Sequence, residues 1–475
     1  MRSLGKGSRR RKSGRKRVGQ VSYYQHHGGW HVYYRDGNRQ VRRRAGDTEE
    51  SAAQVAAQIN AQLAVAAPTL FSFTPLSVPE LRRKFLEHHE HVLRSTLATV
   101  SRYRAATQHL ENFARAAAPS SPAHLLDGDQ FVRYLRTIRI APNGHNHSAK
   151  RPLRDKGIRF ILESCRSLYG FAAKKRHLPP YGENPFAGLG GKKFRVEDAK
   201  PVFVFDQATE LRLLLAANDW SFPIHFILAK TGIRVGELVH LLVEDLDLNG
   251  GWLQIRNKPE LGWRIKTGRQ RAVPLIEEVV SVFRRVIGGR TAGLVFRKET
   301  FRAADCPLGD ATRLRLAKEV ERRVAVESGA AVPLARTAEA QLARTVWRDA
   351  GATTSDRIRS SFTRLTGALG LESVSCPKSW RHTFATLLQD ANVDPLVRQL
   401  VLGHAVTSGR ESPLGMTGVY THTRPETLRR EIFRALQLWP ASLAEGRQWA
   451  GRREEHSTTE ELGLDRNRSQ SRSSP

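Results

Sequence analysis

PIHFILAKTGIRVGELVHLL, residues 223–242, places a turn-forming glycine between two apolar helical patterns. Apolar residues dominate both sides of Gly232, at the spacing expected of α-helices. Glycine readily adopts the left-handed backbone that ends many helices, so the stretch predicts a helix, a tight turn at Gly232 and a second helix. Arg234 follows shortly after the turn. The motif therefore predicts a guanidinium group at the joint between two helices.

Short strands and further helices are expected downstream of this joint. Residues 252–258, 263–268 and 269–275 are predicted as short strands around turns. Residues 300–370 are rich in alanine and arginine and have a helical composition. The stretch KSWRHTFATLLQDA, which begins at Lys378, predicts another helix.

Several polar side chains in this part of the chain stand out by type and setting. They are Arg234, Lys266, Lys378, Arg381, His404 and Tyr420. Lys378 and Arg381 lie three residues apart at a helix start, so they share one face. Each residue alone has an ordinary explanation, because a lone arginine is usually a solvated charge and a lone tyrosine usually packs. A histidine after a helix is often a cap on free carbonyl groups.

The charge of the chain points to a polyanionic partner. Its 475 residues include 77 Lys and Arg against 46 Asp and Glu, a formal net charge of +31. This excess predicts binding to nucleic acid, the commonest polyanion. No apolar run of about 20 residues is present, so no membrane partner is expected. The length predicts more than one domain.

The cysteines argue against a disulfide framework or a zinc site. Cys165, Cys306 and Cys376 are far apart and form no CxxC pair. This usage fits a reducing compartment. The N-terminal residues 1–17 have the charge of a signal sequence, but no apolar segment follows them. We therefore expect an intracellular protein.

The N-terminal region predicts a small β-sheet followed by a helix. VSYYQ, WHVYYR and RQVRRR are rich in aromatic and β-branched residues or in arginine, and Asp36-Gly37 separates two of them as a hairpin signal does. An alanine-rich helix is expected after Thr48. A basic face on such a sheet can enter a DNA groove, although an ordinary miniature domain has the same pattern. The expected DNA-binding residues here are Arg35, Arg39, Arg42 and Arg43.

Residues 76–186 predict a bundle of helices. Apolar residues recur there at helical spacing, as in Ile158, Ile161, Leu162 and Cys165, and they are interpreted as core. The opposite faces are basic, which again suits DNA. The expected DNA-binding residues of this bundle are Arg102, Lys156 and Arg159.

Composition places the boundaries between these regions at proline-, glycine- and lysine-rich stretches. The expected divisions are a disordered basic arm at 1–19, a module of three strands plus a helix at 20–67, a helical domain at 68–186, a linker at 187–200, a third domain at 201–440 and a disordered tail at 441–475.

Five short motifs occur in the same order as the motifs of a known protein family. TGIRVGEL, IKTGRQRAVPL, SWRHTFATLL, LGH and VYTH resemble the successive motifs of the phage-integrase-type tyrosine recombinase family. The resemblance covers about residues 200–437. The helical block is similar in position to that family's core-binding domain, and residues 20–66 to its arm-binding domain. The implied fold class is multidomain and mainly α with small β-sheets, ending in a mixed α/β catalytic domain.

The resemblance implies a role for each matching residue. Tyr420 would be the nucleophile that forms a 3′-phosphotyrosyl bond and releases a 5′ hydroxyl. Arg234 and Arg381 would pair the phosphate oxygens, because a guanidinium fork binds two oxygens and stays protonated. Lys266 would be the general acid, and His404 would hydrogen-bond the scissile phosphate. The family needs no metal, so no metal and no cofactor are expected.

The chain departs from the family pattern in three places. Lys378 stands where the family often has histidine, which puts the role of this residue in doubt. The connection from His404 to Tyr420 is longer than usual, as is the connection over residues 300–370. Glu237 is interpreted as structural, steadying the turn at Arg234.

The resulting hypothesis is a site-specific recombinase that integrates or excises a mobile element. Its partner would be double-stranded DNA, on which a homotetramer assembles, and its location would be the cytoplasm, at the nucleoid. Two alternatives stay open: a DNA-binding protein without catalysis, and a topoisomerase-like enzyme of the same chemistry. The amphipathic segment 424–438 would either dock on a neighbouring protomer or fold back on its own domain.

Overall fold

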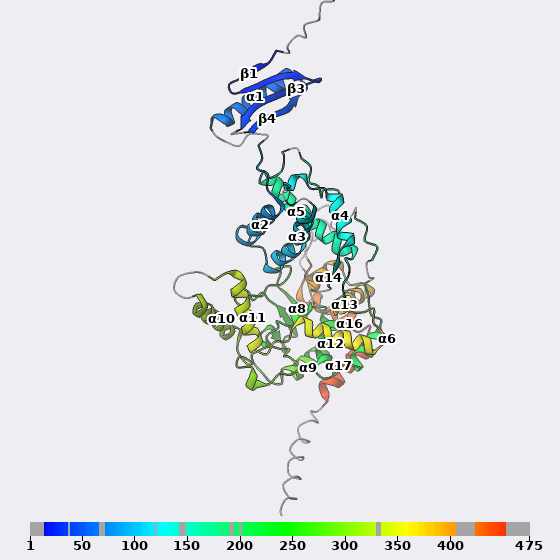
Figure 1. Cartoon of the computed structure of the whole chain (residues 1–475). Coiled ribbons are helices and arrows are strands. Elements are labelled where there is room, and N and C mark those ends of the chain that lie inside the picture. Colours follow the sequence, from blue (N-terminus) through cyan, green and yellow to red (C-terminus); the bar gives the residue numbers. More distant parts are fainter. Residues whose placement is uncertain are drawn as a thin grey trace, which may run out of the picture. The chain divides into compact units, whose positions relative to one another are not determined.

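The computed structural model describes residues 14–36, 39–65, 72–117, 119, 121–141, 149–180, 182–189, 194–198, 202–328, 334–404 and 423–452. The chain divides into two compact units, residues 1–200 and 201–475. Most described residues are helical and the sheets are small, so the expected fold class is confirmed (Figure 1).

The first unit begins with a four-stranded antiparallel sheet in the order β1-β2-β3-β4. One face of the sheet packs against helix α1, where Val21, Val32, Ala56 and Ile59 are fully buried. The elements are β1 (Lys16–Val18), β2 (Val21–His26), β3 (Gly29–Asp36), β4 (Arg39–Gly46) and α1 (Glu49–Ala64).

The first strand, β1, corrects the expectation of a disordered arm over residues 1–19 and of a three-stranded sheet. Lys16 pairs with Tyr23 and Val18 with Val21, across a turn in which Gly19 has φ +55°. The arginines and lysines around this strand suggested a solvated tail. A short edge strand, however, needs only backbone hydrogen bonds on one side, and charged side chains suit an exposed edge.

The rest of the first unit is a helical domain built around α5. Its apolar face packs on the other helices, and the buried Tyr169 hydroxyl donates to the carbonyl of Ala123 at 2.8 Å. Ser77 and Glu80 form a capping box that starts α2. The elements are α2 (Val78–Glu87), the π-helical η1 (His88–Val92), α3 (Leu97–Ala117), α4 (Gly128–Thr137), β5 (Arg139–Ile140), β6 (Arg151–Pro152) and α5 (Asp155–Lys174).

The second unit has a main core of helices around a small antiparallel sheet in the order β7-β8-β9. Helix α7 is buried along its whole length, which explains its uninterrupted apolar sequence. The elements of this core are α6 (Gln207–Leu215), α7 (Ser221–Thr231), α8 (Val235–Leu238), β7 (Leu246–Asp247), β8 (Trp252–Ile255), β9 (Arg271–Pro274), α9 (Glu277–Ile287), α12 (Ser355–Ala368), α13 (Lys378–Asp390), α14 (Pro395–Leu402), α16 (Pro425–Leu436) and α17 (Pro440–Gly451).

The predicted helix, turn and helix around Gly232 are confirmed. Gly232 ends α7 in the left-handed conformation with φ +60°, and α8 follows as a single short helix. A Cβ atom at this position would lie 2.2 Å from the ring of Phe384 on α13. Glycine is therefore required here both for the backbone conformation and for the close approach of α13.

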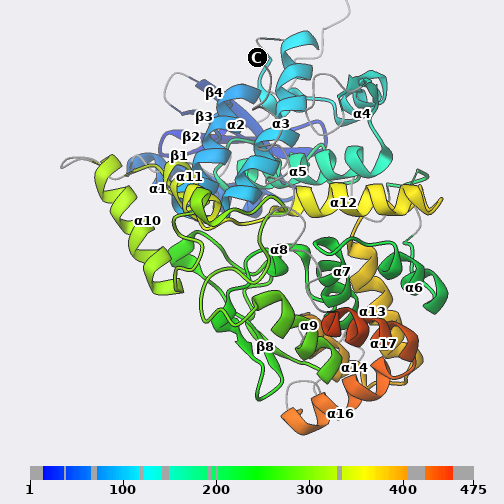
Figure 2. The same ribbon diagram turned by 90° about the horizontal axis from the view of Figure 1, so that it is seen from below.

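A second, smaller core is formed by a helical hairpin, α10 (Arg313–Ser328) and α11 (Arg336–Asp349). The two helices lie side by side at one end of the unit, away from α6, α13 and α17 (Figures 1 and 2). Leu316, Val346 and Trp347 pack there against Leu261 and Leu294. The helical composition of residues 300–370 is thus confirmed as an inserted hairpin with its own packing.

The strand predicted over residues 263–268 is wrong. The ladder between β8 and β9 ends at the pair Ile255 and Arg271, and the intervening residues close a loop instead. Within it, Trp263 makes an isolated bridge with Lys258, and residues 266–268 form a turn. The alternating pattern of WRIKTG resembles a strand, but Gly268 has φ +72°, which suits a turn.

The C-terminal helices pack on their own domain. Ile432 and Leu436 of α16 are fully buried in the main core, in contact with α13 and α14. Residues 441–451, expected to belong to a disordered tail, form most of α17 instead. There Leu443 is buried, and Trp449 stacks on Phe222 and donates its indole N–H to Asp219 at 3.1 Å. Apolar packing and polar contacts, such as that of Arg447 with Glu278, together hold this helix on the domain.

The buried histidine of α7 leads to a stability prediction. His225 has no exposed surface and neither ring nitrogen has a hydrogen-bond partner, and burial lowers its pKa to about 4. Because an unfolded histidine titrates near pH ~6.5, the unfolded chain binds this proton first and stability falls as the pH drops from 6.5 toward 4.

We expect the wild-type second unit to lose about 2 kcal/mol more than His225→Leu between pH 7 and pH 5. Urea unfolding followed by tryptophan fluorescence measures the difference. The exposed His91 supplies the control, since His91→Gln should leave the pH dependence unchanged. Parallel pH profiles for wild type and His225→Leu would contradict the assignment.

Candidate active site

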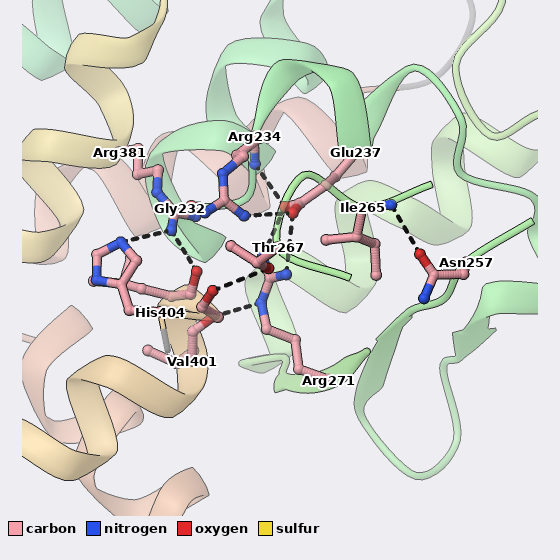
Figure 3. A network of polar contacts seen from close by, with 12 residues as sticks. Gly232, Arg234, Glu237, Asn257, Ile265, Thr267, Arg271, Arg381, Val401 and His404 are labelled. Atoms are coloured by element: carbon pink, nitrogen blue, oxygen red, sulfur yellow. Dashed lines mark hydrogen bonds and ion pairs between the residues drawn. The ribbon is translucent and has the colours of Figure 1, made fainter. Parts of the chain in front are cut away.

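A buried carboxylate, Glu237, organises the residues after the Gly232 turn. The backbone N–H of Arg234 donates to Glu237 Oε2 at 2.9 Å, and its guanidinium Nη1 donates to Oε1 at 2.8 Å. The Glu237 side chain is 2% exposed and that of Arg234 is 23% exposed. The turn thus holds the Arg234 guanidinium at the edge of the site, as Figure 3 shows. Glu237 steadies this turn, as the sequence predicts.

Arg271, the first residue of β9, approaches Glu237 from the other side. Its Nη1 and Nη2 atoms donate to both carboxylate oxygens, at 3.1 and 2.7 Å, and its Nε donates to the carbonyl of Val401 at 2.8 Å. Burial raises the pKa of Glu237, but the hydrogen bonds and charge of Arg271, together with those of Arg234, outweigh it and hold the pKa below its usual value. Glu237 is therefore ionised and bridges two guanidinium groups.

Arg381 joins three separate segments of the domain. It lies on α13 with 8% of its surface exposed. Its Nη1 donates to the carbonyl of Gly232 at 2.7 Å, and its Nη2 donates to the carbonyl of Leu402 and contacts His404 Nε2 at 3.2 Å. Burial, followed by the charges of Arg234 and Arg271, lowers the pKa of Arg381 to about 10. The group remains a cation at neutral pH.

His404 follows Gly403, which ends α14 with φ +63°. Burial and then the charges of Arg381, Arg234 and Arg271 lower the pKa of this imidazole below its usual value, so it is neutral at pH 7. A guanidinium cannot accept a hydrogen bond, so Nε2 accepts from Arg381 and the ring proton lies on Nδ1. The imidazole thus keeps one N–H donor for a ligand (Figure 3).

Lys266 lies in an exposed turn at the border of this network. Thr267, its neighbour, donates its hydroxyl to the carbonyl of Gly403 at 3.4 Å, which brings the turn to the residue before His404. Lys378 is exposed at the first residue of α13, where its charge contributes after burial to lowering the pKa of His382. Tyr420 lies outside the described residues.

The structure therefore gathers three of the predicted residues, Arg234, Arg381 and His404, around one point. Sequence reasoning missed Arg271, whose guanidinium completes the group. The available signal was its place in the motif IKTGRQRAVPL, where it follows the predicted turn. In its motif, Arg271 looked like one of several solvated arginines.

The basic residues expected on the N-terminal sheet differ in position. Arg42 lies opposite Tyr33 on the face that α1 leaves open, and its guanidinium lies 5.2 Å from the ring of Tyr24. Arg35 lies on the same face, opposite Gln40. Arg43 pairs with Val32 and so belongs to the helix-covered side, although it is exposed at the edge. Arg39 opens β4, and only its backbone is described.

The basic residues expected on the helical domain are partly engaged by neighbouring side chains. The guanidinium of Arg102 lies 4.5 Å from the ring of Phe160. Arg159 pairs with Glu163 at 3.3 Å, and Lys156 is exposed. Arg102 and Lys156 thus keep charge at the surface, whereas Arg159 is partly neutralised.

The described residues offer neither a candidate metal site nor a membrane-spanning helix. No group of three or more His, Cys, Asp or Glu side chains in them could hold a metal ion. None of the described helices is long and apolar enough to cross a membrane.

The chain is similar to known proteins over much of its length. Residues 206–427 match the phage integrase family. Tyrosine recombinase XerD of Pasteurella multocida is 23% identical over 284 residues, covering 57% of this chain and 72% of the relative. The transposase from transposon Tn916 of Enterococcus faecalis is 31% identical over 107 residues, covering 20% of this chain and 26% of the transposase.

Among solved structures, the Tn1549 transposon integrase in complex with transposon right end DNA is similar. It is 18% identical and has a TM-score of 0.49, covering 76% of this chain and 99% of that chain.

The buried bridge between Arg271 and Glu237 gives a stability prediction. Removing one partner of a buried ion pair leaves the other charge poorly compensated, so we expect Arg271→Ala to lower the free energy of unfolding by about 3 kcal/mol. The matched control is Arg284→Ala, because the pair of Arg284 and Glu277 is exposed and should contribute at most ~1 kcal/mol. Urea unfolding measures both, and equal losses would show that the Glu237 bridge is not structurally special.

Proposed function

We propose that the protein is a site-specific DNA recombinase of the phage integrase family, whose model matches residues 206–427. It would cut and rejoin duplex DNA through a 3′-phosphotyrosyl intermediate. The observation that supports this best is the convergence of Arg234, Arg381 and a neutral His404. Their free donors suit a phosphodiester, whose oxygens gather negative charge during substitution at phosphorus.

Arg234 and Arg381 would bind the non-bridging oxygens of the scissile phosphate. Arg381 is fixed by two backbone carbonyls, so its remaining donor directions are set before the DNA arrives. Preorganised donors need no rearrangement as the charge develops, which is why they favour the transition state. Glu237 would add one negative charge to this cluster of cations. Because its side chain is buried, it would leave the position of the phosphate free.

His404 would donate its Nδ1–H to the same phosphate. Its lowered pKa keeps the ring neutral at pH 7, so it serves as a hydrogen-bond donor without adding another cation beside the arginines. Lys378, at the start of the same helix as Arg381, would contribute a further donor to phosphate.

The bond changes balance without a cofactor. The phenolic oxygen of Tyr420 would form a bond to phosphorus while the bond from phosphorus to the 5′ oxygen breaks, and Lys266 would give its proton to that oxygen. The phenol would lose its own proton to solvent or to a nearby acceptor. In the second step a 5′ hydroxyl of the exchanged strand would attack the phosphotyrosine and release Tyr420. One phosphodiester is broken and one is formed, so no nucleotide is consumed.

The other parts of the chain would hold the DNA. In this proposal the helical domain over residues 68–186 and the catalytic domain clamp the duplex at the core site, and the N-terminal sheet reads a second site through Arg35 and Arg42. Strand exchange needs an active centre for each strand of two duplexes, which favours a homotetramer assembled on DNA.

The biological role would be integration or excision of a mobile element. Relatives named as transposases of transposons Tn916 and Tn1545 support this choice. A recombinase with this role would work on the chromosome, at the nucleoid.

A covalent trap tests the nucleophile. Nicked duplexes that tile the DNA flanking the gene should yield a covalent adduct with the wild-type protein, since the short strand diffuses away after cleavage and cannot be religated. Tyr420→Phe should form no adduct because it lacks the attacking oxygen, whereas Tyr134→Phe, a matched change in the helical domain, should form the adduct normally. Denaturing gels detect the adduct. Its absence with wild type would support a DNA-binding protein without catalysis.

The phosphate clamp makes a separate prediction. Arg381→Lys keeps the charge but cannot reach Gly232, Leu402 and His404 together, so cleavage should slow by about 10²–10³-fold. DNA affinity, measured by mobility shift, should change little because most affinity comes from other phosphate contacts. The control is Arg359→Lys on the exposed side of α12. If Arg381→Lys cleaves as fast as that control, Arg381 has no part in the transition state.

A further inference from the structure

The inserted hairpin of α10 and α11 contacts the loop that leads to Lys266. The indole N–H of Trp347 on α11 donates to the carbonyl of Leu261 at 2.9 Å. A Cβ atom added at Gly262 would lie 3.0 Å from the Cβ of Ala343, so the helix and the loop are in close contact. Helix α11 of the hairpin therefore packs directly against residues 261–262 of this loop.

Three aromatic rings, those of His240, Trp263 and Trp347, add to the contact between the hairpin and this loop. His240, which follows α8, stacks on Trp263 with ring centroids 4.9 Å apart, and Trp347 meets the imidazole edge-on at a centroid distance of 4.9 Å. Burial lowers the pKa of His240 to about 4, so the ring is neutral. Trp263 lies three residues before Lys266, so His240 links Trp347 of the hairpin to the segment that leads to Lys266.

The side chain of Asn257 closes the turn that carries Lys266. Ile265 and Gly268 begin and end this turn, and the Gly268 N–H donates to the Ile265 carbonyl at 2.8 Å. Asn257 supplies the two missing bonds: its Oδ1 accepts from the Ile265 N–H at 2.8 Å, and its Nδ2 donates to the Gly268 carbonyl at 2.9 Å. Lys266 therefore belongs to a four-residue turn whose two ends are held by one amide. Figure 3 shows the contact of Asn257 with Ile265.

Arg313, the first residue of α10, links Asn257 to the hairpin. Its Nη2 donates to the carbonyl of Asn257 at 3.0 Å, and its Nε donates to Glu260 at 2.6 Å. The N–H of Arg313 donates to Glu244 Oε2 at 2.9 Å, which secures the helix start. Hydrogen bonds thus run from α10 through Asn257 to the turn of Lys266.

A buried ion pair supports the base of the loop. Lys258, next to Asn257, is 1% exposed and donates to Asp245 Oδ2 at 2.7 Å. Its backbone pairs with that of Trp263, with hydrogen bonds of 3.1 and 3.0 Å. The path of the chain directly after Asn257 is therefore fixed by a buried ion pair and by backbone hydrogen bonds.

We propose that Asn257 is a positioning residue for Lys266, and that the α10–α11 hairpin holds Asn257 in place through Arg313. The inference rests on the proposed function, in which Lys266 protonates the leaving 5′ oxygen. A lysine on a flexible stem is an efficient acid only when its backbone is held near the leaving group. On this proposal, the long connection over residues 300–370 supports the general acid.

The leaving group itself provides the test. A leaving alkoxide needs a proton, because its conjugate acid is about as weak as water, pKa ~15.7. A 5′-bridging phosphorothiolate leaves as a thiolate, whose conjugate acid has a pKa near ~8.5, and needs no general acid. A variant that only misplaces Lys266 should therefore be slow on the oxygen duplex and nearly normal on the sulfur duplex.

The probe is a nicked duplex that traps the wild-type protein, prepared with oxygen or sulfur at the scissile 5′ position. Asn257→Ala should slow cleavage of the oxygen duplex by about 10²-fold and of the sulfur duplex by less than about threefold. Arg313→Ala should also slow cleavage of the oxygen duplex more than that of the sulfur duplex, but by a smaller factor than Asn257→Ala. The matched control is Arg315→Ala, an exposed arginine on the same first turn of α10, which should cleave both duplexes normally.

The outcomes distinguish failure of the positioning role of Asn257 from failure of the general-acid role of Lys266. Equal slowing on both duplexes by Asn257→Ala and Arg313→Ala, or no slowing on either, would overturn the positioning role. Lys266→Ala is the reference: if it too fails to prefer the sulfur duplex, the assignment of Lys266 as general acid is at fault. If Lys266→Ala prefers sulfur and the Asn257 and Arg313 variants do not, only the positioning role fails. Thermal unfolding of each variant checks that the fold is retained.

Discussion

The active site depends on one buried carboxylate placed among arginines. Arg234, Arg271 and Arg381 lie close enough for their charges to affect one another, and like charges at such range repel. Glu237 offsets this repulsion by accepting from Arg234 and from both ends of the Arg271 fork. The cluster can therefore form without a bound anion, because Glu237 supplies a negative charge from within the core.

A second constraint is that the clustered groups come from distant parts of the chain. Arg234 comes from the turn after α7, Arg381 from α13 and His404 from the end of α14, and backbone carbonyls anchor them to one another. The turn of Lys266 is tied to the same end of α14 through Thr267. The main core thus sets the relative positions of Arg234, Arg381 and His404, whereas the smaller core packs the hairpin against Leu261 of the loop and against Leu242 and Leu294.

Short motifs in the sequence were enough to predict Arg234 and Arg381 as candidate site residues. They were also enough to predict the helix, turn and helix around Gly232. It did not predict Arg271, because its partner Glu237 lies 34 residues earlier and the two meet only when β9 takes its register. The short β1 and the helix α17 were not predicted, because β1 depends on backbone pairing with β2 and α17 on contacts with distant residues such as Phe222. The roles of Tyr420 and Lys266 rest on motif order and not on contacts.

Gly232 carries a consequence for how such a site can evolve. Every other amino acid there needs an unfavourable backbone and also brings a Cβ atom to 2.2 Å from Phe384. A smaller residue at position 384 would relieve the collision but would leave the cost of the left-handed backbone, so the two penalties at Gly232 are separate. Any substitution of Gly232 should therefore disturb Arg381 together with the turn that carries Arg234, because Arg381 donates to the Gly232 carbonyl.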